Sequence, residues 1–264
     1  GAALGISGSM IQGMTKNPLA DPGLLGITAG ASLMLTLGYV ISGTISFAWL
    51  TFLSFLGALG GIVLVIGFSL FSREKLSTFT LLLVGSSVTM FLLALSQGIG
   101  LLFNITKNVN MWTSGGLSAV TWSQIAVIAP VMVVALGIAL IFSKEITLLS
   151  LDENLAISLG QKVNRTKLIL MVLIAVLTGL AVSLAGNMAF VGLMIPHLVR
   201  LLVGHDYRRI IPVSIMVGGL FMMASDLLSR TLNRPYEIPL VAIVSVIGLP
   251  FFLIIVRRHK GGAL

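Results

Sequence analysis

The side chains that could carry out chemistry in this chain are eight carboxylates and three histidines, because it contains no cysteine. The sequence shows no HExxH zinc pattern, no nucleophile triad and no Gly-Lys pair of the kind that a Walker A loop requires. His197 follows Pro196, where an imidazole usually serves backbone carbonyls that the proline leaves without a donor. We therefore expect no catalytic residue, no metal site and no cofactor.

The positions of the acids also bear on how transport could be driven. Ion-coupled carriers usually bury a carboxylate or a histidine near the bilayer centre. Asp226 alone falls within a predicted span, four residues before Arg230, with which we expect an interfacial ion pair. The other acids fall in or beside predicted loops. Neither proton coupling nor ATP hydrolysis has an evident site, so the energy for any pumping would come from a partner.

The composition predicts an all-α integral membrane protein. Hydrophobic residues make up 57% of the chain and charged residues 9%, whereas a soluble domain carries about 25% charged residues. The apolar runs last about 20 residues, the length of a spanning helix, while the strands of a membrane barrel alternate over about 10. The net charge of +8 comes from basic residues in the loops, which favours a membrane orientation signal over nucleic-acid binding.

We expect one transmembrane domain over residues 1–264, with no room for a second, soluble domain. The predicted spans are about 1–14 (partial), 24–42, 46–71, 77–102, 122–142, 168–185, 188–203, 210–230 and 237–256.

The charge-free stretch 168–199 decides which side each later loop faces. It could form one tilted helix or a tight hairpin at Gly186-Asn187. The hairpin places 13 of the 16 Lys and Arg residues on one side, whereas a single helix divides them nine to seven. The positive-inside rule favours the hairpin, and it puts the turn at 17–22, the loop 143–167 and the C-terminus in the cytoplasm.

Two short segments have patterns of their own. In the first, the turn of Asn17, Pro18, Asp21 and Pro22 interrupts the helix, because each proline lacks an amide donor and pushes the preceding residue toward extended geometry.

Small residues also recur at helical spacing, as at Gly26 and Gly30. This pattern predicts close helix packing more than a pathway lining.

The second segment lies in the loop 143–167, where Ser150 and Glu153 have the spacing of a capping box. This predicts a short helix over 151–159 that ends at Gly160. Leu151, Leu155 and Leu159 then form one stripe. The stripe could dock in a groove of a partner protein or lie on lipid headgroups, and the residues alone leave both open.

Arg230 and Arg234 are two of the three basic residues predicted on the opposite side. They could be interfacial anchors or an electrostatic dock for an acidic partner.

Four segments together resemble the FecCD/BtuC-like permeases, which import iron–siderophore, haem or cobalamin complexes. The matching segments are 17–26, 148–160, 190–208 and 237–251. The resemblance implies a ten-helix permease fold of which helix 1 and part of helix 2 are missing here, so that the domain is N-terminally truncated.

The resemblance also implies partners and site residues. Such permeases pair with a second permease subunit, bind cytoplasmic ATP-binding subunits that hydrolyse ATP, and receive cargo from an extracytoplasmic substrate-binding protein. It implies that the loop 143–167 couples the permease to the ATPase, and that Arg230 contacts the binding protein; Arg234 has no match. The coupling residues would be Ser150, Leu151, Glu153, Leu155, Leu159 and Gly160.

The expected cargo is an iron–siderophore complex, carried across the bacterial cytoplasmic membrane. The alternatives are haem or cobalamin as cargo, an ion-coupled secondary transporter, or a membrane scaffold that transports nothing.

Overall fold

The computed structural model describes residues 1–42, 46–71, 78–118, 120–233 and 235–260. Within these ranges the chain forms twelve α-helices and one 3₁₀ helix. The helices are α1 (Ala2–Thr15), η1 (Pro22–Leu25), α2 (Ile27–Ser42), α3 (Phe47–Leu70), α4 (Thr78–Leu102), α5 (Thr106–Thr113), α6 (Trp122–Ile141), α7 (Ser143–Leu151), α8 (Glu153–Ser158), α9 (Val163–Ala185), α10 (Val191–Val203), α11 (Tyr207–Thr231) and α12 (Leu240–Lys260).

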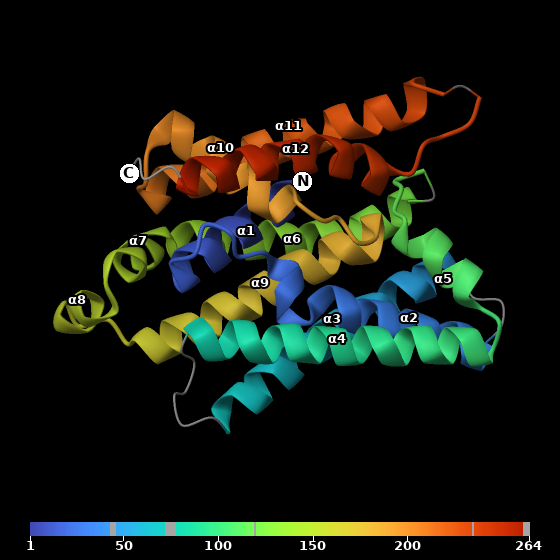
Figure 1. The fold of residues 1–264 in the computed structure, drawn as a ribbon, viewed down its shortest axis with the longest axis horizontal. Helices are drawn as coiled ribbons and strands as arrows, with labels where there is room; N and C mark the ends of the chain where they lie inside the picture. Colours follow the sequence, from blue (N-terminus) through green and yellow to red (C-terminus); the bar gives the residue numbers. More distant parts are fainter. Residues whose placement is uncertain (43–45, 72–77, 119, 234, 261–264) are drawn as a thin grey trace.

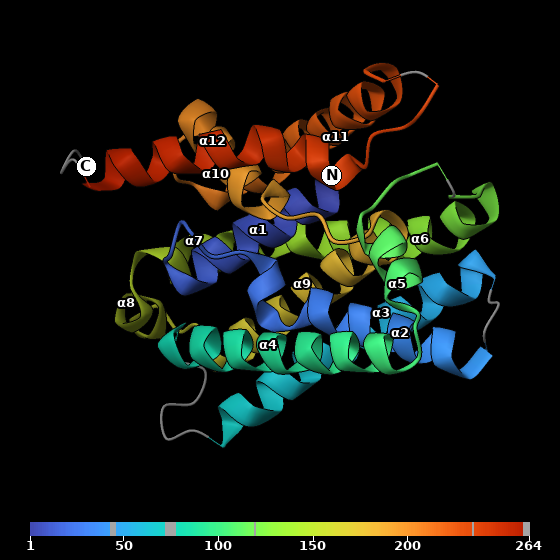
Figure 2. The same cartoon turned by 45° about the vertical axis from the view of Figure 1, so that its right-hand side comes forward.

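The helices lie roughly along one long axis, with α1 and α9 in the middle of the bundle (Figures 1 and 2). One end, the α8 end, holds α7, α8 and the last turns of α12. The other, the α5 end, holds α5 and the connection between α11 and α12. Among the described residues, five helices are long and apolar enough to cross a membrane: α3, α4, α6, α9 and α11. The all-α membrane architecture is therefore confirmed.

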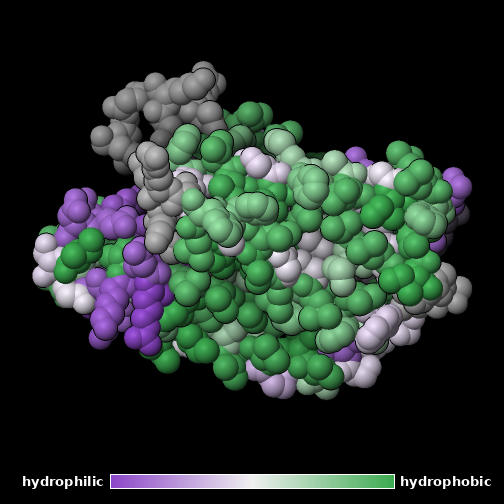
Figure 3. Space-filling model, turned by 90° about the horizontal axis from the view of Figure 1, so that it is seen from below, coloured by the Kyte–Doolittle hydropathy of each residue, from purple (hydrophilic) through white to green (hydrophobic). Residues whose placement is uncertain are grey.

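The distribution of hydrophobic residues on the molecular surface shows how the bundle is oriented in the membrane. Figure 3 shows a face that is mostly hydrophobic along its length, with hydrophilic residues gathered most densely at the end where α8 lies. Lipid tails can cover an apolar belt of this kind, whereas the polar end needs water. The long axis of the bundle is thus the axis that crosses the bilayer.

Small residues let the central helices approach closely. A methyl group added at Gly8 of α1 would lie 1.7 Å from the carbonyl oxygen of Gly192, and one at Gly30 of α2 would lie 2.2 Å from that of Gly57 in α3. Such contacts exclude any side chain at these positions and bring backbones together as membrane helices require. The interpretation of the small-residue rows as packing seams is confirmed.

The hairpin at Gly186-Asn187 is also confirmed. Helix α9 ends at Ala185, Gly186 takes φ 81°, and α10 starts at Val191. Because α10 has 13 residues, it is only about 20 Å long at 1.5 Å per residue. Helix α10 therefore starts inside the bundle rather than at its surface.

A second break in the helices lies beside the first. The segment 16–26 leaves α1 and returns into the bundle, so that the ring of Pro22 contacts the start of α10 at Gly192. The side-chain amide of Gln12 donates across this contact to the carbonyl oxygens of Ala20 (3.4 Å) and Leu193 (3.3 Å). Irregular backbone at this depth is tolerated because it is buried in protein and its carbonyls find donors.

Three predictions need correction. Asp21 and Pro22 lie among the helices instead of in an aqueous loop, because the turn folds back along α1. The polar patch after α4 contains a helix, α5, which begins after Asn104 reverses the chain at φ 55°. The residues before Ser150 form another helix, α7, rather than a loop.

Candidate functional site

The two helix breaks meet in what we call the interior junction, formed by residues 16–26 and 186–192. Asp21 caps η1 there, its Oδ1 accepting from the Gly23 amide at 2.7 Å. Its other oxygen lies at the start of α10, 3.4 Å from where a Cβ at Gly192 would stand. Asp21 thus caps η1 and lies beside the first turn of α10, where the positive end of a helix stabilises a nearby carboxylate. Transporters often place their central sites between such half-helices.

A small cavity lies beside Asp21. Its volume of about 10 Å³ is close to the space that one water molecule needs. Thr28, Thr178 and Asn187 line it. Among the described residues the hydroxyl of Thr178 has no hydrogen-bond partner, although the side chain is only 1% exposed. The interior junction is therefore polar, yet it is too small for a chelate.

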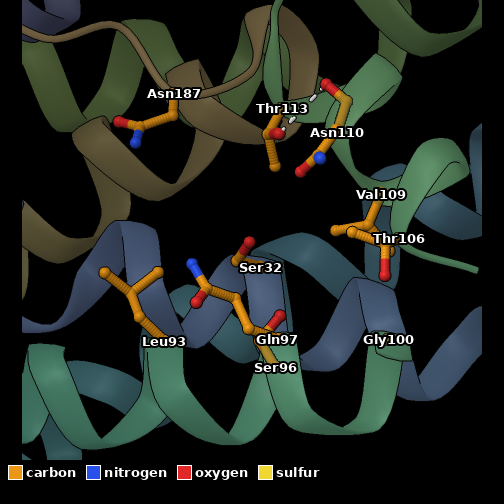
Figure 4. Close-up of a pocket in the computed structure, with 10 residues that line it drawn as sticks. All are labelled: Ser32, Leu93, Ser96, Gln97, Gly100, Thr106, Val109, Asn110, Thr113 and Asn187. Atoms are coloured by element: carbon orange, nitrogen blue, oxygen red, sulfur yellow. Dashed lines mark hydrogen bonds between the residues drawn. The ribbon is translucent and has the colours of Figure 1, made fainter. Parts of the chain in front are cut away.

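A larger polar pocket opens toward the α5 end (Figure 4). It has a volume of about 140 Å³ and lies between α2, α4, α5 and the hairpin after α9. Its polar lining side chains are Ser32, Ser96, Gln97, Thr106, Asn110, Thr113 and Asn187. Asn187 lines both this polar pocket and the small cavity, so the two spaces share a wall.

Hydrogen bonds fix the elements around the polar pocket. The hydroxyls of Thr36 and Ser96 are 2.8 Å apart and join α2 to α4. The backbone amide of Asn187 donates to the carbonyl of Thr113 at 3.2 Å, which joins the end of α5 to the hairpin.

Phe190, near this wall, takes φ 67°. This conformation is uncommon for an aromatic residue and tends to occur at functional sites.

The α8 end carries the segment that the sequence singled out for coupling. Asp152, not Ser150, caps α8: its Oδ1 accepts from the amides of Asn154 (2.7 Å) and Leu155 (3.0 Å). The amide of Leu155, and then that of Asn154, lower the pKa of Asp152 because they favour its charged form. The predicted capping box is wrong, because the hydroxyl of Ser150 donates instead to the carbonyl of Thr147 at 2.7 Å.

Glu153 also has a different partner from the one predicted. It forms an ion pair with Lys167 of α9, with Nζ to Oε2 at 3.0 Å. The Lys167 side chain is 2% exposed and that of Glu153 is 41% exposed. The pair ties α8 to the first turns of α9. Sequence reasoning missed it, because a separation of 14 residues gives no local spacing signal.

The helix predicted over 151–159 is shorter in the structure, because Asp152 is extended and α8 runs only over Glu153–Ser158, but its predicted stop is present. Gly160 takes φ 84° just after the helix. Leu151, Leu155 and Leu159 are 65%, 46% and 62% exposed, whereas Ala156 on the other face is fully buried. The apolar stripe of the α8 end therefore consists of three exposed leucines, Leu151 at the end of α7, Leu155 on α8 and Leu159 at its C-cap.

Helix α7 anchors this end to the rest of the bundle. Ile146 and Leu149 are fully buried, and the hydroxyl of Thr147 accepts from the Tyr207 amide at 3.1 Å. The loop before α11 therefore lies against α7. That places 143–160 and 204–209 at the same end, as the hairpin interpretation requires.

At the α5 end, the expected ion pair on α11 is present. Arg230 Nε lies 2.9 Å from Asp226 Oδ2, and the Arg230 side chain is 42% exposed. Arg234 lies outside the described residues. Among the residues that the structure describes, no group of three or more His, Asp or Glu side chains could hold a metal ion.

Comparison with known proteins identifies the class. The model of the FecCD transport family matches residues 1–258, and the chain belongs to this family. It is therefore a multi-pass membrane permease of the type found in ABC importers.

Two characterised relatives and two solved structures are similar to it. The Iron(3+)-hydroxamate import system permease protein FhuB of Bacillus subtilis is 39% identical over 99% of this chain and 68% of its own. The Fe(3+) dicitrate transport system permease protein FecC of Escherichia coli is 35% identical over 98% of this chain and 79% of its own.

A structure described as an inward-facing conformation of a metal-chelate type ABC transporter superposes with a TM-score of 0.88 at 30% identity, covering 98% of this chain and 83% of that one. PsaBC from Streptococcus pneumoniae, at a TM-score of 0.65 and 19% identity over 96% of this chain and 87% of its own, shares the fold.

Proposed function

We propose that this chain is the permease subunit of an ATP-driven importer that moves an iron–siderophore complex across the cytoplasmic membrane. The observation that carries the proposal is the apolar stripe of α8, exposed at one end of a membrane bundle whose interior is a polar junction of broken helices. The names of the relatives support an iron chelate as cargo. Haem and cobalamin are the alternative cargoes.

The apolar stripe is assigned to docking on a cytoplasmic ATP-binding subunit. Leu151, Leu155 and Leu159 would enter a groove on that subunit, as an amphipathic helix does. Ser150, Glu153 and Gly160 shape and hold the segment. A partner that hydrolyses ATP supplies the energy for which this sequence has no Walker A loop.

The other partners follow from the geometry of the two ends. The α5 end would face the extracytoplasmic substrate-binding protein, with Arg230 as an electrostatic contact, because its guanidinium stays 42% exposed beside Asp226. The α8 end and the C-terminus of α12 would be cytoplasmic, as the distribution of basic residues favours. A second permease subunit would complete the translocation path, and lipid would cover the remaining apolar surface.

The mechanism that fits this arrangement is alternating access. ATP binding would favour one of two arrangements of the ATPase, and the docked α8 segment would carry that preference into the bundle. The ion pair between the buried Lys167 and the partly exposed Glu153 would couple α8 to α9. In this scheme the bundle would change its packing at the helix breaks beside Asp21 and Gly186.

The test replaces Leu155 with Asp. A charge in a docking groove removes a buried anchor worth at least about 2 kcal/mol, so co-purification of the ATPase should be lost. ATP-driven uptake of a radioactive ferric siderophore should fall at least about tenfold. Leu232→Asp is the matched control, because Leu232 is 61% exposed at the opposite end and should leave ATPase binding unchanged. Normal co-purification and uptake in Leu155→Asp would refute the docking assignment.

One observation favours a second candidate, an ion-coupled secondary transporter: Asp21 is a carboxylate enclosed within the bundle. Its capping bond to Gly23 gives it a structural role as well. Asp21→Asn separates the two roles, since asparagine caps a helix about as well as aspartate but cannot carry a proton. We expect Asp21→Asn to keep ATP-dependent uptake. Uptake that follows an ion gradient and disappears in Asp21→Asn would support the second candidate instead.

A further inference from the structure

The polar pocket has a composition that restricts what can enter it. Hydroxyl and amide groups line it, and none of its lining side chains is charged. Lys107 follows Thr106 on α5 but does not line the pocket. Hydroxyl and amide groups each offer both donors and acceptors, so the pocket suits an uncharged group that is rich in oxygen.

The polar groups of the lining differ in how they are bonded: Ser96 pairs with Thr36 and Thr113 donates to the carbonyl of Asn110. Among the described residues, the hydroxyl of Thr106 is buried without a hydrogen bond. In Figure 4, Ser32 and Gln97 project from α2 and α4 into the space below Thr113 and Asn187. Polar groups gathered in this way around a cavity are available for water or a ligand, because leaving them unsatisfied is costly.

Because its lining carries no charge, the pocket should favour neutral ferric chelates over anionic ones. An anionic chelate that entered the pocket would lose hydration without gaining a cationic partner, which is unfavourable. Recognition of carboxylates usually relies on arginine or lysine, and neither lines the pocket. Three hydroxamate anions cancel the three charges of the ferric ion, so a ferric trihydroxamate is neutral and presents carbonyl and amide groups.

We propose that the polar pocket is a subsite for one arm of a neutral, hydroxamate-type ferric chelate during its passage. The proposal rests on the proposed function and names its cargo class. The volume of about 140 Å³ is below the range of about 300–1,000 Å³ that holds a whole drug-sized ligand. The pocket therefore takes part of the chelate, while the remainder lies in the path outside this chain. Thr106, Gln97 and Asn110 provide its hydrogen bonds.

The test uses the complete transporter in proteoliposomes, with its ATPase and binding protein, and measures initial uptake over a range of chelate concentrations. Ferrichrome is the neutral trihydroxamate and ferric dicitrate the anionic chelate. Thr106→Val and Gln97→Leu keep the side-chain size but remove hydrogen bonds. Each should lower the uptake rate of ferrichrome about three- to tenfold relative to ferric dicitrate. Gln97→Lys should shift the preference toward ferric dicitrate.

Thr231→Val is the control, because Thr231 lies on α11 away from the pocket and bonds only to its own helix. It should leave both rates unchanged, and all variants should keep normal ATPase co-purification. Ferrichrome uptake that is unchanged in Thr106→Val and Gln97→Leu, or that falls equally with ferric dicitrate uptake, would overturn the subsite while the proposed function stands. A wild-type transporter that takes up no ferric chelate would overturn both.

Discussion

Asp152 shows how a single side chain decides where the exposed helix begins. Two polar residues, Ser150 and Asp152, compete for the cap of α8, and the structure selects Asp152 because Ser150 belongs to the last turn of α7. The sequence pattern alone could not choose between them, since the length of α7 depends on the burial of Ile146 and Leu149 against the bundle. The position of the cap is thus a tertiary property.

The Asp152 cap predicts a dependence of α8 on pH. The pKa of Asp152 is lowered in the folded protein, so its stabilisation of α8 is complete above the ordinary aspartate pKa of about 3.9. That stabilisation is lost as the pH falls through the lowered value. Hydrogen exchange of the amides of residues 153–158 should therefore accelerate, relative to chemical exchange at each pH, only in strong acid.

Two variants of Asp152 test whether protonation of this side chain causes the faster exchange in acid. Asp152→Ala should make exchange in α8 faster at every pH, because the cap is gone. Asp152→Asn should protect α8 nearly as well as the wild type near neutral pH and should show no loss in acid. An acid-dependent loss that persists in Asp152→Asn would assign the effect to another group.

At the residue scale, prediction from sequence was good for local partners and poor for distant ones. The Asp226–Arg230 pair follows from a spacing of four and is present. The Lys167–Glu153 pair joins two helices through a turn whose path no local pattern specifies. The prolines and polar residues around Asp21 predict an aqueous loop, whereas the contacts with Gln12 and Gly192 hold the segment inside the bundle.

The helices themselves are held by glycine contacts, which gives a test with a matched control. Gly8→Ala places a methyl group 1.7 Å from the carbonyl oxygen of Gly192. Such overpacking costs about 1–3 kcal/mol, so the melting temperature in detergent should fall by roughly 2–12 °C. Gly137→Ala on α6 meets nothing within 4 Å and should leave the temperature unchanged or raise it slightly. Equal effects of the two changes would contradict the role of the glycine contact.

Most element boundaries could be predicted from hydropathy. The span predicted at 46–71 is α3 at Phe47–Leu70, and the span predicted at 122–142 is α6 at Trp122–Ile141. The misses are α5 and α7, which are too polar or too short to be recognised as membrane segments. The polar pocket was missed as well, because its residues come from three helices and a hairpin. Their convergence depends on packing rather than on spacing along the chain.

At the scale of the whole molecule, the orientation can be tested directly because the chain has no cysteine. Leu155→Cys and Arg230→Cys place single thiols on exposed positions at opposite ends. A membrane-impermeant thiol reagent should label Arg230→Cys in intact spheroplasts and Leu155→Cys only in inside-out vesicles. Ile174→Cys, at a fully buried position, should react in neither. Labelling of both exposed positions from one face would contradict the proposed orientation.

Helix α9 connects the α8 end, the Asp21 cavity and the polar pocket. It has 23 residues without a break, a stiff rod of about 35 Å. Lys167 near its start holds α8, Thr178 on its length borders the Asp21 cavity, and Asn187 just beyond its end forms a wall of the polar pocket. A displacement of α8 would therefore be carried along α9 to the turn at Gly186, which holds that wall. The nucleotide state of the ATPase and the affinity of the polar pocket for the chelate would then be coupled through this one helix.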